Sequence, residues 1–135
     1  MSKSKGPSTA NPAPVIHFEI GCQNLAKTGA FYGDLFGWTY ESGMPSMSMI
    51  NNIGGHVKAP TDGIGGHLTS LGHEPHQYVT IYAMVDDIEA MLEKSTKLGG
   101  KIVIPKQEVP GMGWFAWLAD PEGNIIGLWT PMGRG

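Results

Sequence analysis

The segment Val15-Ile-His-Phe-Glu-Ile-Gly-Cys-Gln-Asn-Leu-Ala-Lys-Thr-Gly-Ala-Phe-Tyr-Gly-Asp-Leu-Phe-Gly37 carries the pattern that decides the fold of this chain. Its first seven residues alternate in the direction of their side chains, which predicts a strand with one apolar face. Apolar residues then recur at helical spacing from Leu25 to Phe36, and a glycine at position 37 is typical of a helix end. The segment therefore predicts a strand followed by a helix.

The same pattern returns in the second half of the chain, where an alternating run, Tyr78–Val85, precedes a helical run that ends at Gly99-Gly100. Leu25 and Ile88 are 63 positions apart, and so are Gly37 and Gly100. Each half therefore predicts a β-α-β-β-β unit. The remaining strands are expected at Trp38–Tyr40, Ser46–Ile50, Gly65–Thr69, Lys101–Ile104, Trp114–Ala119 and Ile125–Thr130.

Neither half can cover its own sheet, so we expect the two units to pack together around a shared cavity. The predicted fold class is α+β, with the two repeats forming one incomplete mixed-sheet barrel. Residues 1–14 are expected to be a flexible lead-in to a single domain, 15–131, made of modules 15–72 and 76–131. We expect the apolar rows of the first strands (Ile16, Phe18, Ile20; Val79, Ile81, Ala83) to face the helices and the mixed rows (His17, Glu19; Tyr78, Thr80, Tyr82) to face the cavity.

The composition excludes several classes of protein. Glycine accounts for 20 of 135 residues, but 41% of the residues are hydrophobic, which is enough for a core. A net charge of −3 argues against a nucleic-acid partner, and the apolar runs are too short to span a membrane. Cys22 is the single cysteine, so an internal disulfide is excluded. Since the first residues also lack the apolar core of a signal peptide, a cytoplasmic location is expected.

Four runs of sequence, in this order, resemble the vicinal oxygen chelate superfamily, which includes lactoylglutathione lyase (glyoxalase I), bleomycin-resistance proteins and extradiol dioxygenases. They are Phe31-Tyr-Gly-Asp-Leu-Phe-Gly-Trp38, Val85-Asp-Asp-Ile-Glu-Ala90, Leu98-Gly-Gly100 and Asp120-Pro-Glu-Gly-Asn-Ile-Ile-Gly-Leu-Trp129. The last run looks closest to small proteins related to lactoylglutathione lyase. The resemblance implies the glyoxalase-like fold, a small-molecule ligand and a homodimer.

The resemblance also implies positions for a divalent metal, which relatives of the metal-dependent kind use as a Lewis acid. These positions fall on His17, His67, Thr80 and Gly127 in this chain. Only the two histidines can bind Zn²⁺, Ni²⁺, Mn²⁺ or Fe²⁺, and catalytic sites usually have three protein ligands. No metal ligand is therefore assigned, and His17 and His67 are the candidates. The glycine at position 127 leaves open a cavity that is enlarged where a glutamate is missing.

Glu19 and His17 are the candidate catalytic residues. Glu19 is either a general base, its pKa raised by desolvation, or a structural partner of a neighbouring group. His17 and His67 are each a metal ligand, a general base or a hydrogen-bonding group of the cavity wall. Trp129 shares a strand face with Gly127, which suits a flat ligand stacked on the indole. The expected ligand-binding residues are His17, His67, Thr80, Tyr82 and Trp129.

Two functions remain open at this stage, and with them the question of whether the chain is an enzyme. The first is the binding of a small organic molecule in the cavity without a complete metal site. The second is a metal-dependent lyase, isomerase or dioxygenase that acts on a substrate with adjacent oxygens. The glycine-rich stretch from Asn52 to His67 lacks a phosphate-binding pattern and is either a flap over the cavity or a permissive connection.

Overall fold

The computed structural model describes residues 12–53, 63–71 and 75–133. Most of the lead-in and most of the glycine-rich stretch lie outside the described residues. The first module contains β1 (Val15–Gly21), α1 (Leu25–Phe36), β2 (Thr39–Met44), β3 (Met47–Asn51) and β4 (Gly65–Thr69). The second contains β5 (Tyr78–Met84), α2 (Ile88–Lys97), β6 (Lys101–Val109), β7 (Gly113–Ala119) and β8 (Ile125–Pro131).

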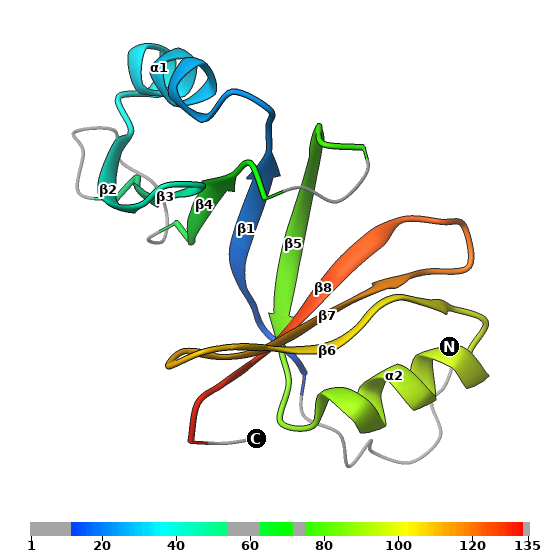
Figure 1. Ribbon diagram of the computed structural model, residues 1–135. Coiled ribbons are helices and arrows are strands. Elements are labelled where there is room, and N and C mark those ends of the chain that lie inside the picture. The colour runs from blue at the N-terminus through cyan, green and yellow to red at the C-terminus, as the bar shows by residue number, and fades with distance from the viewer. Residues whose placement is uncertain (1–11, 54–62, 72–74, 134–135) are drawn as a thin grey trace.

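The strands form one mixed sheet of eight, in the order β2-β3-β4-β1-β5-β8-β7-β6. Within each module the first strand pairs in parallel with the last, β1 with β4 and β5 with β8. The two modules join through the antiparallel pair β1 and β5 at the centre of the sheet (Figure 1). The sheet is not closed into a barrel, which confirms the predicted glyoxalase-like α+β architecture.

Both helices begin at side chains that accept a backbone hydrogen bond. Asn24 accepts from the amide of Lys27 at 2.9 Å, and Asp87 accepts from the amide of Ala90 at 3.0 Å. Such N-caps satisfy amides that have no partner inside the helix. At the other end of α1, Gly37 adopts φ 73°, a left-handed conformation that glycine takes at little cost. None of the described helices is long and apolar enough to cross a membrane.

Each module has its own hydrophobic cluster. Figure 1 shows α1 beside the strands of the first module and α2 beside those of the second, at opposite ends of the molecule. The first cluster contains Ile20, Ile50 and Leu68, with Phe18, Leu25, Tyr32, Trp38 and Tyr40 packed against it. The second contains Val85, Ile88, Leu92, Ala116 and Leu128. The cavity between the modules is therefore framed by two separately packed units.

The expectation that both apolar rows face the helices is only partly correct. Val79 is 69% exposed and Ile81 is 36% exposed, because α2 packs against β6, β7 and β8 and leaves the outer face of β5 uncovered. Ile16 lines the cavity instead, next to a register shift between Val15 and His17. β6 is also longer than expected, since it continues past Ile104 to Val109 in its pairing with β7.

Candidate functional site

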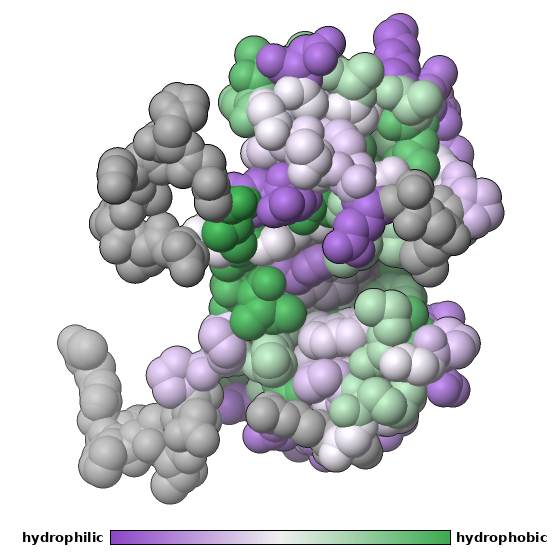
Figure 2. Space-filling view, turned by 90° about the vertical axis from the view of Figure 1, so that its left-hand side faces the viewer, coloured by the Kyte–Doolittle hydropathy of each residue, from purple (hydrophilic) through white to green (hydrophobic). Residues whose placement is uncertain are grey.

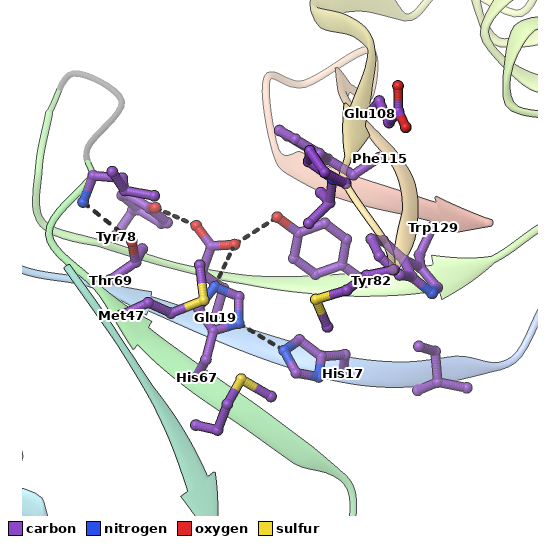
Figure 3. Close-up of a pocket in the computed structure, with 16 residues that line it drawn as sticks. His17, Glu19, Met47, His67, Thr69, Tyr78, Tyr82, Glu108, Phe115 and Trp129 are labelled. Atoms are coloured by element: carbon purple, nitrogen blue, oxygen red, sulfur yellow. Dashed lines mark hydrogen bonds and ion pairs between the residues drawn. The ribbon is translucent and has the colours of Figure 1, made fainter. Parts of the chain in front are cut away.

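A cavity of about 540 Å³ lies between the two modules, a volume suited to a small organic ligand. In Figure 2 both hydrophobic and hydrophilic residues border the recess between the upper and lower halves of the molecule. Its wall is mostly apolar, with polar groups gathered over β1, β4 and β5 (Figure 3). The lining residues are Ile16, His17, Glu19, Met47, Met49, His67, Thr69, Leu71, Tyr78, Tyr82, Glu108, Val109, Pro110, Met112, Phe115 and Trp129.

The carboxylate of Glu19 is the centre of the polar groups (Figure 3). It is 5% exposed and accepts hydrogen bonds from the hydroxyls of Tyr78 and Tyr82, the latter at 2.5 Å. His67 Nε2 lies 3.2 Å from Glu19 Oε1. Burial alone would raise the pKa of the Glu19 carboxyl, but these three donors outweigh burial and hold that pKa below its ordinary value of 4.5. Of the two roles that the sequence left open for Glu19, the raised pKa is therefore not found and the hydrogen-bonded structural partner is. Sequence does not show that three donors converge on this side chain.

The two tyrosines stay protonated in this arrangement. Burial, together with the neighbouring Glu19 carboxylate, raises the pKa of both phenols far above their usual value of 10. The Tyr82 oxygen also accepts a hydrogen bond of 2.9 Å from the indole Nε1 of Trp117. Tyr82 is thus held from both sides, and both phenols act as hydrogen-bond donors to Glu19.

The two cavity histidines contact each other, and His67 also contacts Glu19. His17 Nε2 and His67 Nδ1 are 2.7 Å apart, and the two rings are tilted by 31°. Pairing of β1 with β4 places Glu19 opposite His67. Burial is the main cause that lowers the pKa of His17 from 6.5 to about 4; the neighbouring His67 lowers it further, and Glu19 opposes the shift. His17 is therefore neutral at pH 7.

Gly127 does not enlarge the cavity. A Cβ atom added at position 127 would lie 2.4 Å from the ring of Tyr82, which pairs with Gly127 across β5 and β8. The phenol ring therefore fills the space in which a glutamate would stand. The enlargement that the sequence left open does not occur, because the ring of Tyr82 on the neighbouring strand occupies the space beside the glycine.

The other predicted site residues are divided between the cavity and the core. Trp129 lines the cavity and pairs with Phe115 across β7 and β8, so two aromatic rings border the same wall. Thr80 is buried, donates its hydroxyl to the carbonyl of Ile125 at 2.9 Å and does not line the cavity. His17, His67 and Tyr82 do line it, as expected from their strand faces.

The residues present do not fit a complete divalent metal site. Of the four positions that the family resemblance implies, Thr80 already donates its hydroxyl to a backbone carbonyl and Gly127 has no donor atom. Glu19, the nearest carboxylate, accepts three hydrogen bonds. No group of three or more candidate ligands occurs among the described residues, where a catalytic site usually has three. Two histidine nitrogens remain, which is too few.

Sequence reasoning missed one wall of the cavity. This wall comes from the end of β6, the turn that follows and the start of β7, and it contains Glu108, Val109, Pro110, Met112 and Phe115. Two of these residues had a weak signal in the sequence. Phe115 precedes Trp117 by two positions and so shares its strand face, and Met112 is a flexible side chain of the kind that can line an adaptable pocket. The others reach the cavity because the β6–β7 hairpin folds over it, which is a tertiary contact.

The match to a family model covers most of the chain. Residues 15–128 match the Glyoxalase/Bleomycin resistance protein/Dioxygenase superfamily. The chain belongs to this superfamily. The matched range includes both modules, in agreement with the resemblance seen in the sequence.

Two of the curated relatives are much longer than this chain. It is 25% identical over 134 residues to the anthracycline biosynthesis protein DnrV of Streptomyces peucetius, a match that covers 87% of this chain and 47% of the relative. It is 29% identical over 115 residues to the putative glyoxylase CFP32 of Mycobacterium bovis, covering 79% and 41%. The chain therefore spans about half the length of these relatives.

Solved structures with the same fold have diverged widely in sequence. A superfamily member from Vibrio splendidus 12B01 has a TM-score of 0.57 and 15% identity, covering 90% of this chain and all of that one. A methylmalonyl-CoA epimerase bound to methylmalonyl-CoA and NH₄⁺ has a TM-score of 0.59 and 15% identity, covering 90% and 96%. At this identity the likeness shows the fold alone.

Proposed function

We propose that this protein binds a flat, uncharged organic molecule in the cavity between its modules, without a complete metal site. The observation that carries the proposal is a largely apolar cavity of about 540 Å³ that has polar groups gathered in one part. Cavities of this kind bury most of a small ligand and fix its orientation through a few hydrogen bonds.

Charge supports an uncharged ligand over an anionic one. The described lining contains two carboxylates, Glu19 and Glu108, and neither Lys nor Arg. Glu19 is ionised, and an anion placed beside its buried carboxylate would be repelled. The superfamily likeness and the relative named as an anthracycline biosynthesis protein are consistent with an organic ligand.

The aromatic wall supports a flat ligand. Trp129 and Phe115 face the cavity from neighbouring strands, and an aromatic ligand stacked on an indole gains about 0.5–1.5 kcal/mol beyond the burial of its surface. Met47, Met49 and Met112 add flexible side chains that adapt to the outline of a ligand.

Quenching of tryptophan fluorescence by 5-nitroindazole, a flat and uncharged molecule, tests the proposal. We expect saturable binding at one site and an affinity about 5-fold lower in Trp129→Leu, because the stacked indole is lost. Trp38→Leu is the control, since Trp38 packs against Phe18 and Tyr32 away from the cavity. Unsaturable quenching, or equal losses in both variants measured by calorimetry, would contradict binding in this cavity.

A further inference from the structure

The direction of the hydrogen bonds around Glu19 has a consequence for His17. An ionised carboxylate only accepts hydrogen bonds, so the His67 nitrogen that faces Glu19, Nε2, carries a proton. With one ring proton, at Nε2, His67 has a free lone pair on its other nitrogen, Nδ1, which accepts from His17 Nε2 at 2.7 Å. His17 Nδ1 is left as the unprotonated nitrogen of its ring.

That nitrogen is accessible. His17 lines the cavity, and its Nδ1 has no hydrogen-bond partner among the residues that the structure describes. Among the described residues, His17 Nδ1 is not one of the side-chain atoms that are fully buried and have no hydrogen-bond partner. Since it has no partner, protein atoms do not fully enclose it. A ligand in the cavity can therefore reach a basic nitrogen of His17, while the contact of His17 Nε2 with His67 orients the ring.

We infer that Glu19, His67 and His17 form a proton relay in which His17 Nδ1 is the acid–base group of the cavity. The inference rests on the proposed binding function and adds proton transfer to it. When Nδ1 takes a proton from a bound molecule, the Nε2 proton of His17 moves to His67 Nδ1. The positive charge then lies on His67 beside the Glu19 carboxylate, and reversal of these steps returns the proton.

This arrangement gives each residue a separate role. His17 is the catalytic residue, because it is the group that meets the bound molecule. Glu19 and His67 are positioning residues, and the hydroxyls of Tyr78 and Tyr82 hold the carboxylate in place. A second residue that orients a histidine base and stabilises its charged form is a common feature of acid–base sites. The substrate class is an uncharged, largely apolar carbon or oxygen acid.

The probe reaction is the ring opening of 5-nitrobenzisoxazole, a flat and uncharged carbon acid. A base removes the hydrogen of C3, the C–H electron pair forms the nitrile, and the N–O bond breaks to leave a coloured cyanonitrophenolate. The proton passes to His17 Nδ1 and then to water. We expect the protein to accelerate this reaction above an equal concentration of free imidazole, and a positioned base contributes about 100-fold or more.

Chemical rescue separates a base from a structural histidine. His17→Ala should lower kcat about 100-fold, and added imidazole should restore part of the rate by occupying the vacated space. Glu19→Gln should lower kcat about 10-fold with KM within about 2-fold of the wild type, and imidazole should not restore it. His76→Ala, a histidine outside the cavity lining, should keep the wild-type rate.

Three outcomes would overturn the relay: no acceleration over free imidazole, a wild-type rate in His17→Ala, or a loss in folded His17→Ala that imidazole does not restore. Binding of unreactive 5-nitroindazole, followed in parallel, keeps the two proposals apart. Binding without turnover overturns the relay and leaves the binding function standing. Absence of both overturns the relay and the proposed function together.

Discussion

At the scale of single residues, the missing metal ligand at Gly127 is linked to the side chain of Tyr82 on the neighbouring strand. The glycine lies where the family resemblance implies a ligand, and the phenol of its strand neighbour fills the space. The same phenol donates to Glu19 and accepts from Trp117. Gly127 therefore provides no ligand atom for a metal, and Tyr82, its strand partner, holds the carboxylate of Glu19 by a hydrogen bond.

Adding a methyl group at position 127 tests this packing. Gly127→Ala should destabilise the protein by about 1–3 kcal/mol, because the new Cβ would meet the Tyr82 ring at 2.4 Å. Chemical denaturation measures the loss. Gly65→Ala, also in a strand, is the matched control, since no described atom lies within 4 Å of the added Cβ. Equal stabilities of the two variants would show that the ring has room to move.

The pH dependence of stability tests the state of His17. Its pKa is about 4 in the folded protein against 6.5 in the unfolded chain, so the unfolded chain binds more protons between these values. Stability should therefore fall as the pH is lowered from 6.5 to about 4, with a contribution of up to about 1.4 kcal/mol per pH unit. Denaturation of His17→Gln across this range should show a flatter slope; an unchanged slope would contradict the burial of a neutral His17.

At the scale of elements, the helices were readable from local signals and the ends of the strands were not. The N-caps at Asn24 and Asp87, and the glycine stop at 37, act within one turn of the chain, so sequence shows them directly. The extension of β6 to Val109 depends on its pairing with β7. Sequence does not predict a strand here, because Pro105 and the charged residues around it are uncommon within strands.

Removal of a helix cap measures one of these local signals. Asp87→Ala should lower the free energy of unfolding by about 1 kcal/mol, because the Ala90 amide loses the acceptor at 3.0 Å. Asp87→Ser restores an acceptor and should recover most of that loss. The comparison is made by chemical denaturation. If Ser were no better than Ala, the cap would not account for the stability of α2.

At the scale of the whole molecule, the prediction of a homodimer acquires a candidate surface. Val79 and Ile81 leave an apolar strip on the outer face of β5, which neither helix covers. Light scattering should give twice the 14.5 kDa chain mass. Val79→Glu should weaken that association, while Val103→Glu on β6 serves as a control at another exposed valine. A monomer mass at micromolar concentration would contradict the prediction.

Metal binding is also a property of the whole site. Zn²⁺, Ni²⁺, Mn²⁺ and Fe²⁺ should not raise Tm, because the described residues bring together two ligand histidines and not three. A bound metal at 100 times its Kd would stabilise the protein by about 2.7 kcal/mol, which thermal unfolding detects easily. A saturable rise in Tm that disappears in a His17→Ala, His67→Ala double variant would favour the metal-dependent alternative.

The sequence by itself determined the repeat, the two helices with their caps, the family and which side chains share a strand face. These features depend on periodicity and on interactions within a few residues, so they are present in the order of the amino acids. Only the tertiary structure decided that Tyr78, Tyr82 and His67 converge on Glu19 and that the β6–β7 hairpin forms one wall of the cavity. Those contacts join residues far apart in the chain, and the pKa shifts of Glu19 and His17 follow from burial and partners that only the packed sheet provides.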